Sequence, residues 1–514
     1  MTGKSATKSD HCEGTMNRRR FVRGSLAAAI GASLPITGAF GAILSPTKTV
    51  DTDIDAVTGA GKSVTLKKAA VQELGESLRG NLLLPGHPAY DDARRVLNAS
   101  ISKFPALIVQ PRGVADVRRA VDFARGSSLL VAVKCGGHSH SGKSTCDKGL
   151  MIDLSLMRGV RVDERERIAY VSGGSLLGDM DNETMQFGLV TSAGTVSHTG
   201  VAGLTLGGGF GRVARRFGLS LDNLRAVDIV TADGKLVHAS ADENPELLWG
   251  VRGGGGNFGL VTNLEFELHP MQREVVGGNI AFPFSKARQL LDFYAEYERG
   301  APDELFLCMG LQNSPEGKAV SFNACYSGPA REAERVFAKV RAAGGTPLRD
   351  TLRTIDYVAL QKSGDVDDPR AVGSYTKSGF SNGLSSKFID SILDGFGEQP
   401  GGSSVFFLYH CGGAINRVAA DATSFPHREI TLTPLLAVSW PITFDPTAQV
   451  AWLRKYWASV EPHMQGFYTN DIIDETQKQV DENYLGNYPR LVALKNKYDP
   501  TNLFRLNANV IPRV

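Results

Sequence analysis

The sequence predicts an α+β fold, and two observations support this class. Short apolar runs typical of strands are mixed with helical patterns, and pairs of such runs flank short polar turns. Three glycine-rich motifs all precede residue 270. A doubly wound α/β fold would instead alternate strands and helices regularly. With 514 residues, the chain is too long for one ordinary core, so two or three domains are expected.

A strand, a helix and two further strands are expected first. Residues 107–109 form a short apolar run, and valine and alanine recur at helical spacing over 114–125. Strands are then expected over residues 127–133 and 149–154, because both segments are apolar and bounded by glycine or serine.

Two hairpins, a helix and another strand are expected next. The hairpins join residues 160–162 with 168–171, and 227–231 with 236–239. Asn244 and Pro245 predict the start of a helix, since these residue types favour the N-cap and the first turn. The glycines at 253–256 end this helix, and a strand is expected over 260–268.

The overall composition is that of a soluble globular protein, with 42% hydrophobic and 21% charged residues. The net charge of +2 does not favour a nucleic-acid partner. None of the six cysteines forms a C-x-x-C pair, and Cys308 and Cys325 are either a disulfide or two free buried thiols. After the N-terminal region, no uninterrupted apolar run reaches the length of a transmembrane helix, so no span is expected in the mature protein.

The N-terminal region predicts export. Paired arginines within residues 17–23 precede an apolar run over 26–36 and then small residues, which together are typical of a twin-arginine signal over residues 1–42. A disordered basic tail is the alternative, but it does not explain the apolar run. The mature protein would be periplasmic or secreted, and residues 43–60 are expected to be a polar linker.

The segment 137–144, GHSHSGKS, matches the pattern of an ATP- or GTP-binding phosphate loop. Such a loop needs a helix directly after it, because the helix amides hold the phosphates. Here only the five residues 145–149 precede the next strand, too few for that helix or for a crossover between parallel strands. The pattern therefore does not predict a nucleotide hydrolase.

The two histidines of this segment do not predict a metal site. No carboxylate or thiolate near His138 and His140 in the sequence completes a ligand set. What remains is a turn between a strand and a loop, which suits a phosphate group that is bound and not hydrolysed.

Two further glycine motifs narrow the class of protein. Residues 254–259 contain G-x-G-x-x-G, but a helix precedes them and a strand follows, the reverse of a Rossmann dinucleotide site. Residues 203–211 include three consecutive glycines, which predicts that backbone or a flat group passes very close.

Together these motifs resemble the FAD-binding domain of the p-cresol-methylhydroxylase type. They resemble more closely the berberine-bridge-enzyme-like oxidases of the vanillyl-alcohol-oxidase superfamily. The matching segments are residues 134–139, 149–154, 173–174, 193–194, 203–211, 218–223, 246–262, 487–491 and 497–504. The resemblance spans about residues 70–514 and implies a two-part FAD domain, 61–270 and 461–514. These parts flank a substrate domain, 271–460, with an antiparallel sheet backed by helices.

The resemblance also implies a cofactor site. His138 would be bonded covalently to the FAD ring, and this would be the single link, since Val196 stands where many relatives have a second attaching cysteine. Lys134 keeps the positive charge of the arginine usual in the family. The implied cofactor-binding residues are Lys134, Cys135, Gly136, Gly137, His138, Ser139, Gly194, Val196, Gly200, Gly203, Gly207, Gly208, Gly209, Asp222, Gly259, Val261, Asn470 and Asn509.

The implied activity is oxidation of a small alcohol, sugar or amine, with a hydride passing to the flavin and O2 reoxidising it to give hydrogen peroxide. Tyr468 matches a tyrosine that faces the flavin and is the candidate catalytic residue, and Lys377 lies in another matching motif. Leu435 departs from the family, which commonly has a polar residue there. A dehydrogenase with another electron acceptor, or a ligand-binding protein without turnover, remains the alternative.

Overall fold

The computed structural model describes residues 50–314, 317–365, 372–398 and 403–513, all within one compact unit. The predicted signal over 1–42 lies outside the described residues. Within the described ranges, no helix is both long and apolar enough to cross a membrane.

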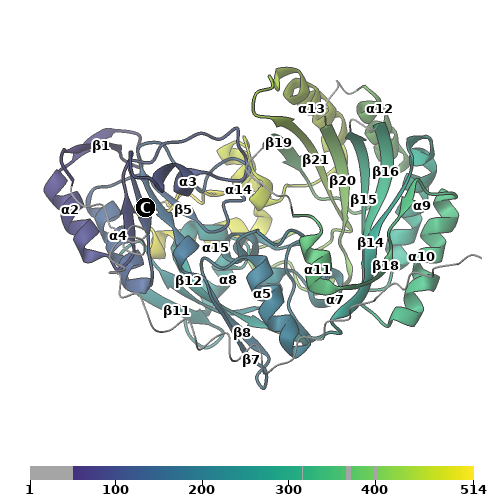
Figure 1. Ribbon diagram of the computed structural model, residues 1–514, viewed down its shortest axis with the longest axis horizontal. Coiled ribbons are helices and arrows are strands. Elements are labelled where there is room, and N and C mark those ends of the chain that lie inside the picture. The colour runs from purple at the N-terminus through teal and green to yellow at the C-terminus, as the bar shows by residue number, and fades with distance from the viewer. Residues whose placement is uncertain (1–49, 315–316, 366–371, 399–402, 514) are drawn as a thin grey trace, which may run out of the picture. The chain divides into compact units, whose positions relative to one another are not determined.

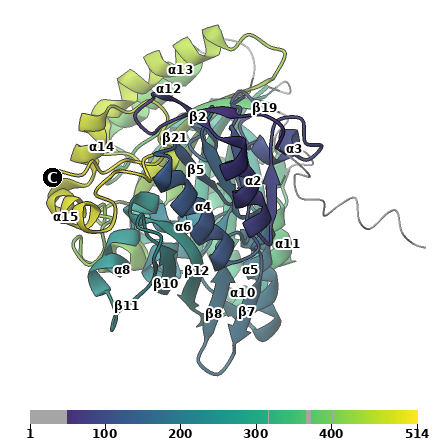
Figure 2. The ribbon, with the colours of Figure 1, turned by 90° about the vertical axis from the view of Figure 1, so that its left-hand side faces the viewer.

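A small mixed sheet lies in the first part of the described chain. Its strand order is β3-β4-β6-β5, with β3 antiparallel to β4 and with β4 and β5 each parallel to β6. The elements are β3 (Asn81–Leu83), β4 (Leu107–Gln110), β5 (Val131–Lys134), β6 (Leu150–Asp153), α2 (Lys68–Ser77), α3 (Tyr90–Arg94) and α4 (Val114–Gly126). Helices α2 and α4 pack on each other, and their apolar faces join the strands in one core (Figures 1 and 2). The predicted strand at 107–109 and helix at 114–125 are confirmed.

The expected linker is wrong for residues 54–57. They form strand β1 (Ile54–Val57), which pairs with β2 (Ser63–Leu66). The side chain of Ala56 is buried while that of Asp55 is exposed, which is the alternation of a strand. The polar composition of the segment made this alternation hard to recognise from the sequence. Ordered structure therefore begins before residue 61.

Two expectations around β5 also need correction. The strand begins at Val131 and not at residue 127, because Ser128 adopts a left-handed conformation (φ 52°) where α4 ends. Strands β5 and β6 are parallel, which five connecting residues would not allow. The whole loop 135–149, without a helix, makes this crossover, so the glycine-histidine segment itself carries the chain from one strand to the other.

The second sheet is antiparallel, with strand order β11-β10-β12-β8-β7. Its elements and neighbours are β7 (Val160–Asp163), β8 (Ile168–Ser172), β10 (Leu224–Val230), β11 (Leu236–Ser240), β12 (Leu260–Glu267), α5 (Leu177–Thr184), α6 (Val201–Gly207), α7 (Ala214–Phe217) and α8 (Pro245–Val251). Both predicted hairpins, the helix after Pro245 and the strand after the glycines are confirmed. Short strands β9 (Leu189–Val190) and β13 (His269–Pro270) pair with each other.

The glycine clusters are explained by close backbone contacts. A Cβ on Gly136 would lie 2.3 Å from the amide nitrogen of Gly200, and one on Gly200 would lie 2.4 Å from that of Gly136. A Cβ on Gly211 would lie 1.5 Å from the carbonyl oxygen of Ala193. Only glycine permits this approach, as the triple-glycine motif predicted.

The third sheet has eight strands and is antiparallel, with the path β17-β14-β16-β15-β20-β21-β19 and β18 beside β14. Its strands are β14 (Glu274–Pro283), β15 (Leu305–Ser314), β16 (Gly317–Tyr326), β17 (Arg349–Asp350), β18 (Arg353–Asp356), β19 (Val372–Ser378), β20 (Ser403–His410) and β21 (Leu432–Pro441). One face packs against helices α9 (Ala287–Tyr297), α10 (Ala330–Gly344), α12 (Ser386–Gly397) and α13 (Thr447–Val460) in a large apolar core (Figure 1). The predicted sheet backed by helices is confirmed, and Cys308 and Cys325 are free and buried.

The chain then returns to the first half. Helices α14 (Gln477–Asn483) and α15 (Tyr488–Tyr498) contribute side chains to the core of the second sheet, and α15 packs against α8 (Figure 2). Helix α11 (Tyr357–Lys362) packs against α5 and β14, so it connects the third sheet with the second.

Candidate active site

A cavity of about 420 Å³ lies where segments far apart in the sequence meet. One wall comes from the turn after β5 and from residues 194–207, and another from residues 255–261 and 504–508. The far wall comes from the third sheet and the segment after Gly466. The volume is in the range of small-molecule and cofactor sites.

Glycines leave room in these walls. Around Gly203 and Gly256, which both line the cavity, no heavy atom lies within 4 Å of the position a Cβ would take. Longer side chains there would project toward the cavity. The cavity is therefore shaped by backbone over much of its length.

His138 lines the cavity from the turn after β5. Its Nε2 lies 2.7 Å from Nδ1 of His198, and its Nδ1 lies 3.3 Å from the hydroxyl of Thr199. Burial, together with the nearby His198 and His140, lowers the pKa of His138 to about 3. The imidazole is therefore neutral at physiological pH and held in one orientation. His198, which was not among the predicted site residues, contacts this imidazole together with Thr199.

Tyr468 also lines the cavity, and its hydroxyl oxygen accepts two hydrogen bonds. The donors are the backbone amide of Gly209 at 2.9 Å and Nδ2 of Asn470 at 2.8 Å. Burial raises the pKa of Tyr468 well above its ordinary value, against the opposing effect of these donors. The phenol therefore stays protonated, and its own O–H is the group it can offer to a ligand.

One face of the third sheet closes the far end. Tyr409 of β20 lies opposite Thr433 of β21, and all of Tyr409, Thr433 and Leu435 line the cavity. Burial raises the pKa of Tyr409 to about 12, although Thr195 and Arg212 oppose this. Sequence reasoning missed Tyr409, because only strand pairing brings it opposite Thr433.

Most predicted site residues are brought together. Those in the cavity wall are Cys135, Gly136, Gly137, His138, Ser139, Gly194, Val196, Gly200, Gly203, Gly207, Gly259, Val261, Tyr468 and Asn470. Lys134, Gly208, Gly209, Asp222 and Asn509 are not among the residues that line it.

The residues outside the cavity have other contacts. The ammonium of Lys134 donates to the carbonyl of Ala93 and lies 3.4 Å from the carboxylate of Asp153. Gly208 and Gly209 instead contact Tyr468. A Cβ on Gly208 would lie 2.8 Å from the tyrosine ring. The carbonyl of Asn509 accepts a hydrogen bond from Gln477.

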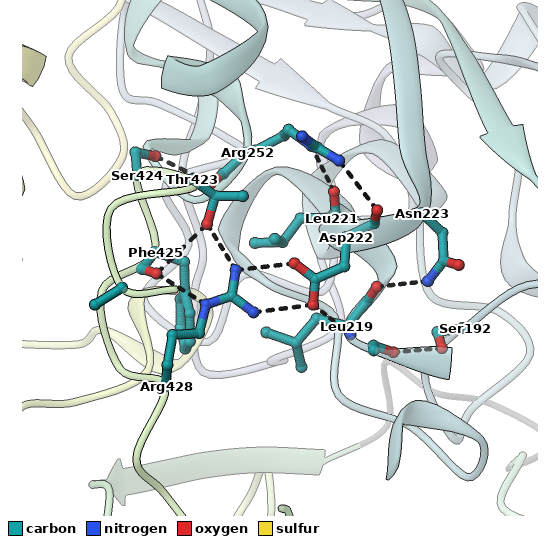
Figure 3. Close-up of polar contacts among 12 residues, drawn as sticks. Ser192, Leu219, Leu221, Asp222, Asn223, Arg252, Thr423, Ser424, Phe425 and Arg428 are labelled. Carbon is teal, nitrogen blue, oxygen red and sulfur yellow. Dashed lines mark hydrogen bonds and ion pairs between the residues drawn. The ribbon is translucent and has the colours of Figure 1, made fainter. Parts of the chain in front are cut away.

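Asp222, predicted from the sequence as a cofactor-binding residue, pairs with an arginine and does not line the cavity (Figure 3). Its carboxylate accepts two hydrogen bonds from the guanidinium of Arg428, at 2.9 and 2.8 Å, and one from the amide of Leu219. Asp222 therefore joins the first half of the chain to the loop after the third sheet's β20. Local sequence could not reveal this, because Arg428 lies about two hundred residues away.

Lys377 is likewise a structural residue. Its ammonium pairs with Asp474 and with Glu475, and it does not line the cavity. It thus attaches β19 to the segment after Tyr468.

The cavity fits FAD. Ser144 and Asn507 line it, and the hydroxyl oxygen of Ser144 and Oδ1 of Asn507 are buried without a partner among the described residues. A long, glycine-shaped cavity with unpaired polar atoms suits a large cofactor with phosphate and hydroxyl groups. Among the described residues, no group of three or more metal-ligating side chains could hold a metal ion.

The comparisons with known proteins agree with this site. Residues 105–240 match the family described as FAD binding domain, and residues 468–511 match the family described as berberine and berberine like. Fold and site together define a flavoprotein with an FAD domain of the p-cresol-methylhydroxylase type.

Within that class, the chain belongs to the berberine-bridge-enzyme-like FAD-linked oxidoreductases. It is 34% identical to an FAD-linked oxidoreductase of Dictyostelium discoideum, over 86% of this chain and 97% of the relative. It is 29% identical to (R)-6-hydroxynicotine oxidase of Paenarthrobacter nicotinovorans, over 85% and 97%. The solved structure of a chitooligosaccharide oxidase superposes with a TM-score of 0.79 at 26% identity, over 87% of this chain and all of that one.

Proposed function

We propose that this protein oxidises a small molecule at a carbon that bears a hydroxyl or amine group. The observation that carries the proposal is one cavity lined by glycine-rich segments, by His138 and by Tyr409, Thr433 and Tyr468. The first part suits FAD, and the last part offers hydroxyl groups to a polar substrate. When bound, FAD supplies the acceptor of a hydride from the substrate carbon.

The proposal includes a single covalent attachment of FAD at His138. The neutral imidazole in the cavity wall has a lone pair on one ring nitrogen, which a bond to the flavin requires, and its contacts with His198 and Thr199 fix the orientation of the ring. Val196 lines the cavity at the position where a second, cysteine link would be expected, and it has no thiol.

Replacement of His138 by alanine is expected to abolish acid-stable flavin. Acid precipitation of the wild type should leave yellow flavin in the protein pellet, while the pellet of His138→Ala should be colourless. The matched control is His87→Ala, which changes a histidine that does not line the cavity and should leave the pellet yellow. Flavin that washes out of the wild type would contradict the attachment.

Turnover is tested by mixing the anaerobic holoenzyme with alcohols, sugars and amines. Loss of the flavin absorption near 450 nm is expected with a substrate, followed by peroxide when air is admitted. Peroxide release would favour an oxidase, and turnover only with an artificial dye would indicate a dehydrogenase. If no compound of these classes bleaches the flavin, a ligand-binding protein without turnover becomes the better hypothesis.

We also propose export by the twin-arginine route. The support is the paired arginines and the apolar run within residues 17–36, which lie outside the described residues. Fractionation of producing cells, with and without Arg18→Lys and Arg19→Lys, checks this proposal. Retention of the wild type in the cytoplasm would contradict it.

A further inference from the structure

A buried acid lies in the cavity wall next to a histidine, and neither residue has a role so far. Asp471 ends the short helical turn η9 (Thr469–Asp471), and His140 belongs to the loop after β5. Oδ1 of Asp471 lies 3.9 Å from Nε2 of His140, and their side chains are only 12% and 26% exposed. Nδ1 of His140 is buried and has no partner among the described residues.

Asp471 lies near the part of the third sheet that carries Leu435. Leu435 of β21 is paired directly with Ser378 of β19, so both side chains are on the same sheet face. Turn η9 packs against β19, the strand that carries Ser378. A carboxyl group is thus present at this end of the cavity, although β21 itself supplies only leucine there.

We propose that Asp471, which lies next to His140, accepts the proton from the substrate hydroxyl or amine. This inference rests on the proposed function. The O–H or N–H bond breaks and its proton goes to the carboxylate, while the C–H electron pair leaves as hydride to FAD. The products are a carbonyl or imine, the protonated carboxyl and the two-electron-reduced cofactor.

Tyr468 then acts as a hydrogen-bond donor and not as the base. Its oxygen already accepts hydrogen bonds from Gly209 and Asn470, and it stays protonated. It therefore positions the substrate oxygen or nitrogen as a hydrogen-bond donor. A donor and an acceptor on one wall of the cavity can hold a hydroxyl group in a fixed orientation.

The surroundings of Asp471 make its carboxylate a stronger base than an exposed one. Burial raises its pKa above the ordinary value and Glu475 adds to this, while His140 and Ser378 oppose it. Tyr409 of β20 and Tyr468, which directly precedes η9, also lie near Asp471, and both are uncharged at neutral pH. A base whose pKa approaches the working pH is more effective in proton transfer.

The first experiment compares Asp471→Asn with Asp474→Asn as holoenzymes. Asp474 belongs to the same segment but pairs with Lys377 and Arg454 away from the cavity. Asp471→Asn should lower the anaerobic rate of flavin reduction by about 100-fold or more, with flavin content unchanged. The wild-type rate should rise with pH through a carboxyl titration above the ordinary aspartate range, and only Asp471→Asn should lose this step.

The second experiment needs no substrate and follows thermal unfolding between pH 4 and pH 8. A raised folded-state pKa means that the protonated acid stabilises the fold, and that this stabilisation is lost as pH rises through that pKa. The melting temperature of Asp471→Asn should therefore exceed that of the wild type, by an amount that grows as pH rises. For Asp474 the pKa is lowered. Burial acts to raise it, but the effects of Lys377, Tyr375 and Arg454 together are larger. The melting temperature of Asp474→Asn should therefore be lower than that of the wild type at neutral pH, and this difference should disappear at low pH.

His140→Gln tests the electrostatic effect of this histidine on Asp471. It should shift the pH dependence of flavin reduction to higher pH, because the nearby histidine opposes the rise of the Asp471 pKa. A wild type that no substrate reduces overturns the proposed function and this inference with it. A reducible wild type with an equally reducible Asp471→Asn, or with no pH-dependent gain in melting temperature, overturns the inference alone.

Discussion

Replacement of Arg428 by leucine is expected to lower the free energy of unfolding by about 3–5 kcal/mol, because it leaves the buried carboxylate of Asp222 without its partner. The side chains of Arg428 and Asp222 are only 3% and 9% exposed. Both carboxylate oxygens accept from the guanidinium, which also donates to Thr423 and to the carbonyl of Phe425 (Figure 3). The measurement is denaturant unfolding followed by tryptophan fluorescence.

The double variant Arg428→Leu/Asp222→Leu is the control for this pair. Removing both charges leaves no unpaired carboxylate, so the double variant should be more stable than Arg428→Leu alone. Arg252 donates to the carbonyls of Leu221 and Asp222 and would still hold that turn. A double variant that is less stable than the single one would show that the pair matters for reasons other than its buried charge.

Replacement of Lys495 by methionine should also cost about 3–5 kcal/mol, since Lys495 and Asp499 form an ion pair with no exposed side-chain area. The three ammonium hydrogens are all used, by Asp499 at 2.7 Å and by the carbonyls of Asn257 at 2.8 Å and Phe504 at 2.9 Å. Methionine has a similar length but no donor. Unfolding in denaturant should show the loss in the holoenzyme and in flavin-free protein alike.

Lys497→Met is the matched control, because Lys497 lies on the same helix and is exposed. Its replacement should change the free energy of unfolding by no more than about 0.5 kcal/mol. Equal losses from the two lysine variants would contradict the assignment of the loss to the buried pair.

The sequence predicted the turn at His138 because its evidence is local. A strand, glycines and a histidine follow one another directly, and the glycines are required wherever two backbones touch, as Gly136 and Gly200 do. The hairpins and helix α4 were predictable for the same reason, since their periodicity depends only on chain neighbours.

The same reasoning did not predict that Asp222 pairs with Arg428, and it gave Asp471 no role. An aspartate after a glycine-rich segment looks the same whether its carboxylate faces a cofactor or an arginine, and the arginine here is contributed by a distant loop. The role proposed for Asp471 depends on its place in the cavity wall and on His140, which lies beside it in the loop after β5.

The sequence by itself determined the family, the α+β class and the glycine-histidine turn, because these depend on residue types at fixed spacing along the chain. The tertiary structure alone decided which carboxylates are paired and which face the cavity. That decision depends on side chains brought together by strand pairing and by the return of the C-terminal segment, so no local pattern could contain it.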